Sequence, residues 1–205
     1  MDEELIEEID FEMQLLIKSG FYNDEEILEI IEDEFFEENV SSDIISSRLS
    51  KNYECIDGLT TVDCIDFNKL ENTFNQLSGL NDIVTIHNAG YDLEEGIQDA
   101  FELFVHLRNN QENPQGFCLY SLEDVEIAIE EKYLSIAFGD FELDEKKAIK
   151  IGETVVNALK DNGFDINWDG TVDNPIEINP FDWKKVFSDK EFSIEGALEV
   201  YNNFH

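Results

Sequence analysis

The sequence predicts an α+β protein with a mixed sheet of about five strands and interleaved helices, preceded by an acidic helical hairpin. In the first forty residues, apolar side chains recur at helical spacing among sixteen acidic residues and a single base, Lys18. From about residue 61, helical and strand patterns alternate along the chain. An apolar fraction of 42% with sixteen Phe residues is enough for a core, so we expect a folded chain.

The first forty-nine residues contain three predicted helices. In the first, apolar positions repeat from Leu5 to Leu16, and Gly20 supplies a stop. The second begins at Asn23, a capping residue with Glu26 three positions on. Its buried stripe is expected to comprise Ile27, Ile30, Ile31 and Phe35. A short third helix is predicted from Ser42 through Leu49.

The remaining elements follow in an alternating order. Helices are predicted around residues 67–77, 93–104, 125–129 and 143–161, and strands at 83–86, 117–120, 133–138, 164–168 and 176–178. Gly79 and Gly163 are expected to end helices, and Asp169-Gly170 is typical of a hairpin turn. We therefore divide the chain into an acidic helical region at 1–52, an α+β core at 60–186 and a C-terminal helix at 187–205.

The charge of the chain bears most directly on function. Its 49 acidic and 13 basic residues give a formal net charge of -36, which repels nucleic acid and anionic membranes. The same field attracts cationic molecules, so a basic protein is the expected partner. The acidity could also serve solubility alone, or adaptation to salt, although the many Ile, Phe and Asn residues disfavour salt adaptation.

Cysteine usage and the amino terminus predict a cytoplasmic protein without a membrane segment. Cys55, Cys64 and Cys118 are odd in number and form no C-x-x-C pair, so we expect reduced thiols. The start, Met1-Asp2-Glu3-Glu4, lacks the basic and apolar parts of a signal peptide. No apolar run approaches the roughly 18 residues of a membrane span.

No catalytic residue or cofactor is predicted. The chain has no P-loop, G-x-G-x-x-G, G-x-S-x-G or H-E-x-x-H pattern. Its three histidines, His87, His106 and His205, stand alone, and Cys118 lies in an apolar strand where an inert thiol is expected. Carboxylate pairs do not discriminate in so acidic a chain.

The one weak metal candidate is the stretch from 165 to 173. Asp165, Asn167, Asp169 and Asp173 match the start of a calcium loop. The bidentate Glu that such a loop needs at its twelfth position is replaced by Ile176. We therefore favour a hairpin over a metal site.

A partner-binding surface is suggested by two phenylalanines that fall outside the apolar stripes. On a helical wheel, Phe36 lies among Glu25, Glu29 and Glu32, and Phe11 lies opposite its helix's buried face. An aromatic ringed by carboxylates is typical of an interface anchor. The competing interpretation is that these helices are covered on two sides and both rings are buried. Because surface phenylalanines are uncommon, burial is slightly favoured.

Several short segments have a distinctive sequence: Ser19-Gly20-Phe21-Tyr22, Asp24-Glu25-Glu26-Ile27, Ala89-Gly90-Tyr91, Tyr133 to Gly139, Trp168-Asp169-Gly170 and Asp182-Trp183-Lys184. Together they resemble a bacterial family known only as a domain of unknown function. The resemblance spans about Ile17 to Lys185 and implies an α+β domain preceded by helices, with no established activity. Relatives often have His where this chain has Ser121, which weakens a catalytic role for that corner.

Charge and the lack of catalytic motifs favour a non-catalytic binding or inhibitor protein. We expect an immunity protein that neutralises a basic toxin such as a nuclease. A neighbouring alternative is a nucleic-acid mimic that inhibits a DNA- or RNA-binding enzyme. The alternative from a different class is an enzyme or metal-dependent protein built around residues 165–173.

Overall fold

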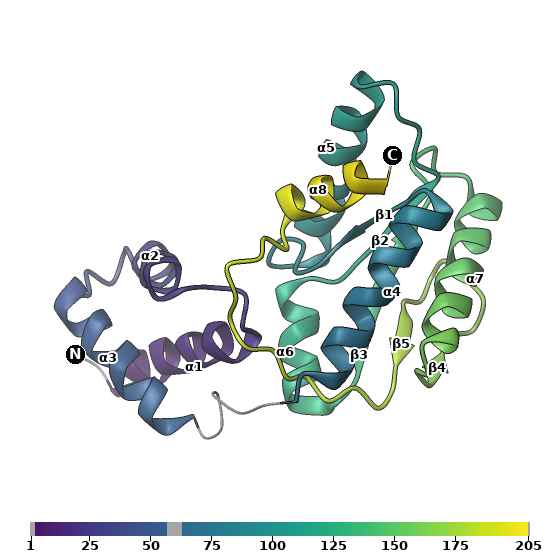
Figure 1. Cartoon of the computed structure of the whole chain (residues 1–205). Coiled ribbons are helices and arrows are strands. Elements are labelled where there is room, and N and C mark those ends of the chain that lie inside the picture. The colour runs from purple at the N-terminus through teal and green to yellow at the C-terminus, as the bar shows by residue number, and fades with distance from the viewer. Residues whose placement is uncertain (1–2, 57–62, 205) are drawn as a thin grey trace. The chain divides into compact units, whose positions relative to one another are not determined.

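The computed structural model describes residues 3–56 and 63–204 and confirms the predicted α+β class (Figure 1). It contains two compact units. We call Met1–Cys64 with Lys184–Asp189 the helical unit, and Ile65–Trp183 with Lys190–His205 the sheet unit. The stretch after Trp183 is therefore shared between them, since 184–189 belongs to the helical unit and the final helix to the sheet unit.

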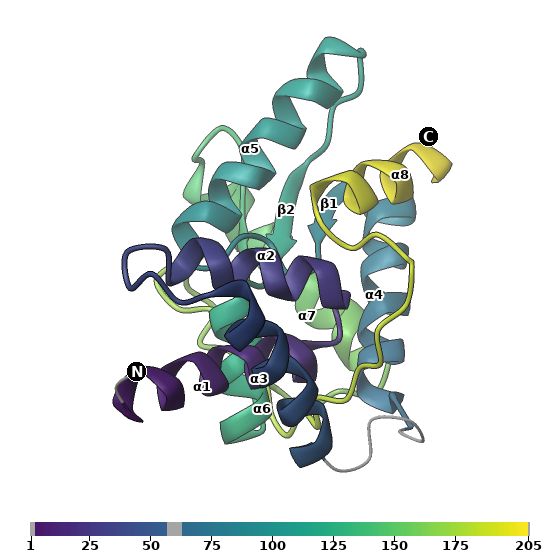
Figure 2. The ribbon, with the colours of Figure 1, turned by 90° about the vertical axis from the view of Figure 1, so that its left-hand side faces the viewer.

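The helical unit contains the predicted hairpin and a third helix, which pack against one another (Figure 2). The helices are α1 (Glu3–Ser19), α2 (Asp24–Glu34) and α3 (Ser42–Cys55). Its core comprises side chains at the predicted helical spacing, including Ile9, Met13, Ile27, Ile31 and Ile45. The predicted capping box is present at the start of α2, because the Asn23 side chain accepts from the Glu26 N–H while Glu26 accepts from the Asn23 N–H.

A partly buried polar network joins α1 to α3. The Asp10 carboxylate accepts hydrogen bonds from Arg48 Nε at 2.6 Å and from Asn52 Nδ2 at 2.9 Å. Gln14 Nε2 donates to Asn52 Oδ1 at 2.9 Å. This network neutralises one of the acids of α1 and fixes the pairing of the two helices.

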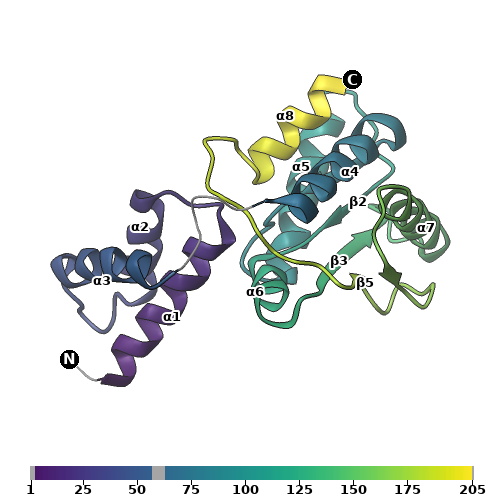
Figure 3. The ribbon, with the colours of Figure 1, turned by 60° about the horizontal axis from the view of Figure 1, so that its bottom comes forward.

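The sheet unit holds five strands in the order β1-β2-β3-β5-β4. Figure 3 labels three of them, β2, β3 and β5. The strands are β1 (Ile83–Ile86), β2 (Gly116–Leu119), β3 (Leu134–Gly139), β4 (Ile166–Asn167) and β5 (Ile176–Ile178). The helices are α4 (Ile65–Asn81), α5 (Leu93–Asn109), α6 (Leu122–Glu131), α7 (Glu145–Asp161) and α8 (Ile194–Phe204). Strands β1 and β2 are parallel and the other pairs antiparallel, so the sheet is mixed as predicted.

Successive side chains of β1 point to opposite faces of the sheet. Val84 and Ile86 join a core cluster with α5, whereas the Thr85 hydroxyl lies 2.9 Å from that of Ser78 on α4. Helix α8 adds Ala197 and Tyr201 to the same cluster as α5. The C-terminal helix is thus part of the core of the sheet unit.

Two elements differ from the predictions. Helix α4 continues through Gly79 and ends at Asn81, so Gly79 does not end the helix. The glycine leaves room for the Phe204 ring, since a Cβ at this position would come within 2.6 Å of it. The left-handed residue that follows is Asp82, at φ 54°. Strands β4 and β5 form the predicted antiparallel return, but residues 168–175 connect them instead of a two-residue turn.

Candidate partner-binding surface

The three predicted acidic residues of α2 lie at the surface. Glu25, Glu29 and Glu32 are all exposed, on the side of the helix away from the buried Ile27 and Ile31. The amphipathic spacing of the sequence accounts for this, since each acid falls outside the apolar stripe. The structure therefore places these carboxylates where another molecule can approach them.

Phe36 is the most exposed aromatic residue on this surface, at 77%, whereas its neighbour Phe35 is 6% exposed. The burial interpretation is therefore wrong for Phe36. The prediction that Phe36 lies on the helix is also wrong. Helix α2 ends at Glu34 with Phe35 as its C-cap, and Phe36 lies in the following turn. Phe35 points into the core and closes the helix, and the chain turns so that the next ring faces solvent.

Phe11 also lies at the surface, at 46% exposure, on α1. Three residues before it, Glu8 approaches Glu34 of α2 closely enough for the two charges to interact. Desolvation, and then the charge of Glu8, raise the pKa of the Glu34 carboxyl. Each phenylalanine is thus within two or three residues of one member of a repelling carboxylate pair.

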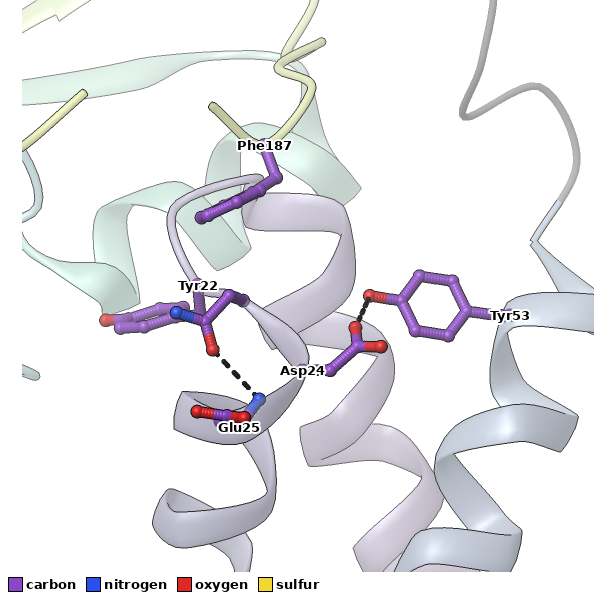
Figure 4. A pocket seen from close by; sticks show the side chains of 6 residues that line it. Tyr22, Asp24, Glu25, Tyr53 and Phe187 are labelled. Atoms are coloured by element: carbon purple, nitrogen blue, oxygen red, sulfur yellow. Dashed lines mark hydrogen bonds between the residues drawn. The ribbon is translucent and has the colours of Figure 1, made fainter. Parts of the chain in front are cut away.

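A hollow of about 480 Å³ opens at the start of α2, within the helical unit (Figure 4). We call it the aromatic hollow; its lining residues are Tyr22, Asn23, Asp24, Glu25, Tyr53 and Phe187. Sequence reasoning found Glu25 but missed the three rings, because they come from the α1–α2 loop, from α3 and from the segment 184–189. The one signal in the sequence was that Tyr22 lies two residues before a run of three acids, Asp24 to Glu26.

The metal candidates are not gathered into a coordination site. Asn167 Nδ2 donates to Glu177 Oε2 at 2.8 Å, and Asp169 Oδ1 accepts from the backbone and hydroxyl of Thr171 at 2.9 and 2.7 Å. The other Asp169 oxygen accepts from Asn174 Nδ2 at 2.7 Å. Within 3–56 and 63–204 there is no cluster of three His, Cys, Asp or Glu residues suited to a metal ion.

The lone histidines and the strand thiol occupy different settings. His87 is buried, with Nδ1 2.8 Å from the Tyr120 hydroxyl and its ring centroid 4.6 Å from that of Phe74. His106 is exposed on α5, and His205 lies outside the described residues. Cys118 is buried in β2, and burial raises the pKa of its thiol.

The Ser121 corner is a helix cap. Its hydroxyl accepts from the Asp124 N–H at 3.4 Å, and Asp124 Oδ2 accepts from the Ser121 N–H at 3.0 Å. These reciprocal bonds form the capping box of α6.

Along the described part of the chain, no helix is both long and apolar enough to cross a bilayer.

Comparison with known proteins decides the family. A family model matches residues 2–187, which is most of the chain and both units. The chain belongs to the family described as Domain of unknown function (DUF6891). Membership confirms the prediction that the chain belongs to a family described only as a domain of unknown function. No curated protein and no solved structure gives a significant match.

Two of the short segments that suggested a family resemblance occupy tightly packed positions in this DUF6891 chain. Gly20, at φ +72°, lies where a Cβ would come within 2.4 Å of the Lys185 carbonyl oxygen, so only glycine fits. Trp183 packs edge-on against Phe67 and Tyr120 in the sheet unit, with centroid separations of 5.8 Å. These segments therefore serve the fold of this DUF6891 chain.

Proposed function

We propose that this DUF6891 chain is a non-catalytic inhibitor that binds a basic protein, as an immunity protein neutralises a toxin. The observation that carries the proposal is Phe36, which is 77% exposed and flanked in sequence by the exposed Glu34, Glu37 and Glu38. A large apolar ring set among charges has the composition of an interface anchor with a polar rim.

The charge of the chain supports a basic partner. A net charge of -36 accelerates the encounter with a cationic surface, and the acids around the anchor orient it. The pair formed by Glu8 and Glu34 adds a local reason, because a cation placed beside two mutually repelling carboxylates lowers the energy of both. The partner is therefore expected to present Lys or Arg residues around an apolar pocket for Phe36.

Two further functions remain as alternatives to this proposal. A nucleic-acid mimic would use the same acids against a DNA- or RNA-binding enzyme and would bind unrelated members of that class. An enzyme or metal-dependent protein centred on residues 165–173 would need Asp169 to release its hydrogen bonds with Thr171 and Asn174. The exposed Phe36 favours the specific-partner function, because an apolar anchor adds selectivity that charge alone lacks.

The test is a titration of the chain with a basic protein encoded beside its own gene. We expect a one-to-one complex whose association rate falls steeply as salt increases. A variant in which Glu25, Glu29 and Glu32 become Gln should associate more slowly while its melting temperature is equal to or above that of the wild type. Failure to form a complex even at low salt would contradict the proposal, and equal affinity for unrelated DNA-binding proteins would favour mimicry.

A further inference from the structure

The aromatic hollow combines three rings and two carboxylates that come from separate segments of the helical unit. Its volume of about 480 Å³ lies within the range of small-ligand sites, about 300–1,000 Å³. Tyr53 and Phe187 expose 37% and 40% of their surface, and Tyr22 is half-buried. Rings that stay partly exposed at a concave surface offer their faces to a ligand.

The carboxylates of the hollow are held at its wall. The Tyr53 hydroxyl donates to Asp24 Oδ1 at 2.7 Å, and Figure 4 shows the two side chains directed toward each other. Asn23 Oδ1 accepts from the N–H groups of Glu25 and Glu26, at 2.8 and 3.0 Å. The capping of α2 is therefore performed by Asn23, and the charges of Asp24 and Glu25 remain exposed at the surface.

The segment that provides Phe187 is anchored two residues earlier. Lys185 is only 5% exposed, and its ammonium donates to the carbonyl oxygen of Gly20 while lying 4.4 Å from the centroid of the Phe21 ring. Because Gly20 and Phe21 lead directly into Tyr22, this anchor holds the Phe187 and Tyr22 sides of the hollow together. The lining is thus organised before any ligand binds.

We infer that the aromatic hollow receives the guanidinium group of an arginine side chain from the protein partner. The inference rests on the proposed function, since it assumes a basic partner. A planar guanidinium stacks on aromatic faces and donates two parallel hydrogen bonds to a carboxylate, so it matches both kinds of lining. The rings of Phe187 and Tyr22 provide the stacking surfaces, and Asp24 and Glu25 provide the acceptors.

The charges near the hollow favour a cation. Asp24, Glu25 and Glu26 form the first turn of α2, and the exposed Lys184 and buried Lys185 are the bases of the adjoining segment. Lys185 directs its charge to the Gly20 carbonyl and the Phe21 ring. The acids therefore outnumber the exposed base, and two of them, Asp24 and Glu25, lie on the wall of the hollow itself.

The experiment titrates the full chain with N-acetyl-arginine amide and, as a matched neutral probe, N-acetyl-citrulline amide. The readout is the NMR shift of the Tyr53 and Phe187 ring protons. We expect saturable shifts with the arginine probe alone, and about fivefold weaker binding in Phe187→Ala and in Asp24→Asn, each of which removes one contact. Leu80→Ala, an exposed substitution on α4 of the sheet unit, should bind the probe like wild type.

Equal shifts with the citrulline probe, or shifts confined to residues outside the hollow, would overturn the inference. Melting temperatures identify any variant that loses its fold, and Asp24→Asn retains an acceptor for the Tyr53 hydroxyl. The two proposals fail separately. A partner complex that needs Phe36 while the arginine probe leaves the hollow unchanged contradicts the hollow alone, and probe binding without any partner complex contradicts the proposed function alone.

Discussion

The ammonium group of Lys185 donates to the carbonyl oxygen of Gly20, immediately after the end of α1. The two residues are 165 positions apart in the sequence, yet both belong to the helical unit. A cation at this point also interacts favourably with the negative end of the helix dipole. The contact thus joins segment 184–189 to the helices and provides a hydrogen-bond donor for a backbone carbonyl at the C-terminal end of α1.

Replacing Lys185 with Met should destabilise the helical unit. The change keeps most of the apolar stem but leaves the Gly20 carbonyl without this donor, at a cost of about 1–3 kcal/mol. Urea unfolding measures the loss. The matched control is Lys184→Met at the exposed neighbouring position, which we expect to change stability by less than about 0.5 kcal/mol. Equal effects of the two substitutions would mean that the buried contact contributes nothing specific.

Lowering the pH from about 7 to about 5, toward the ordinary carboxyl pKa range, should raise the melting temperature, because several carboxyls have a raised pKa in the folded chain. Desolvation is the main cause at Glu34, Asp99, Asp124 and Glu126, and neighbouring carboxylates add to it. A raised acid pKa means that the folded state binds protons more tightly, so stability falls as pH rises from the ordinary pKa through the folded value. Carboxyls with a lowered pKa lose their contribution only below their ordinary values.

Scanning calorimetry at matched ionic strength measures this pH dependence. Glu34→Gln should reduce the slope between those two pH values, because it removes one of the raised carboxyls and its repulsion by Glu8. A melting temperature that falls as the pH is lowered toward about 5 would contradict the directions of these pKa shifts.

Moderate salt should also stabilise the chain. Like charges at a net -36 oppose compaction, and the screening length shortens to about 8 Å at physiological ionic strength. The melting temperature is therefore expected to rise between about 0.02 and 0.15 M NaCl. The variant with Glu25, Glu29 and Glu32 changed to Gln should respond less. A flat response in the wild type would mean that the acids are compensated locally.

Calcium should not bind specifically at residues 165–173. The Asp169 oxygens accept from Thr171 and Asn174, and Asn167 donates to Glu177, so binding would require these bonds to break. Titration calorimetry in about 0.15 M salt should show only weak heats from exposed carboxylates. A saturable one-to-one site in the micromolar range that disappears in Asp165→Ala would restore the metal alternative.

The sequence predicted those features that depend on local periodicity and capping. The Asn23 cap, the Ser121 cap and the alternation of helices and strands are all encoded by neighbouring residues. The prediction that Gly79 ends a helix was wrong. The glycine instead leaves room for the ring of Phe204, which is 125 positions away in the sequence. Such a contact follows from tertiary packing, which local patterns do not contain.

The candidate site was also predicted only in part. Glu25, Glu29 and Glu32 follow from helical spacing, whereas the exposure of Phe36 depends on where α2 ends. The aromatic hollow could not be predicted, because it forms only when α3 and segment 184–189 meet the loop before α2. Its residues have no shared spacing in the sequence.

We propose that Phe36 serves binding and not folding, and the adjacent Phe35 provides a matched control. Phe35→Ala should cost about 3–5 kcal/mol of unfolding free energy because it empties a buried site. Phe36→Ala should cost less than about 0.5 kcal/mol yet weaken partner binding by about 2 kcal/mol. Urea unfolding of both variants, with calorimetric titration of the partner by Phe36→Ala, measures these quantities. A large loss of stability in Phe36→Ala, or partner affinity equal to that of wild type, would contradict the account.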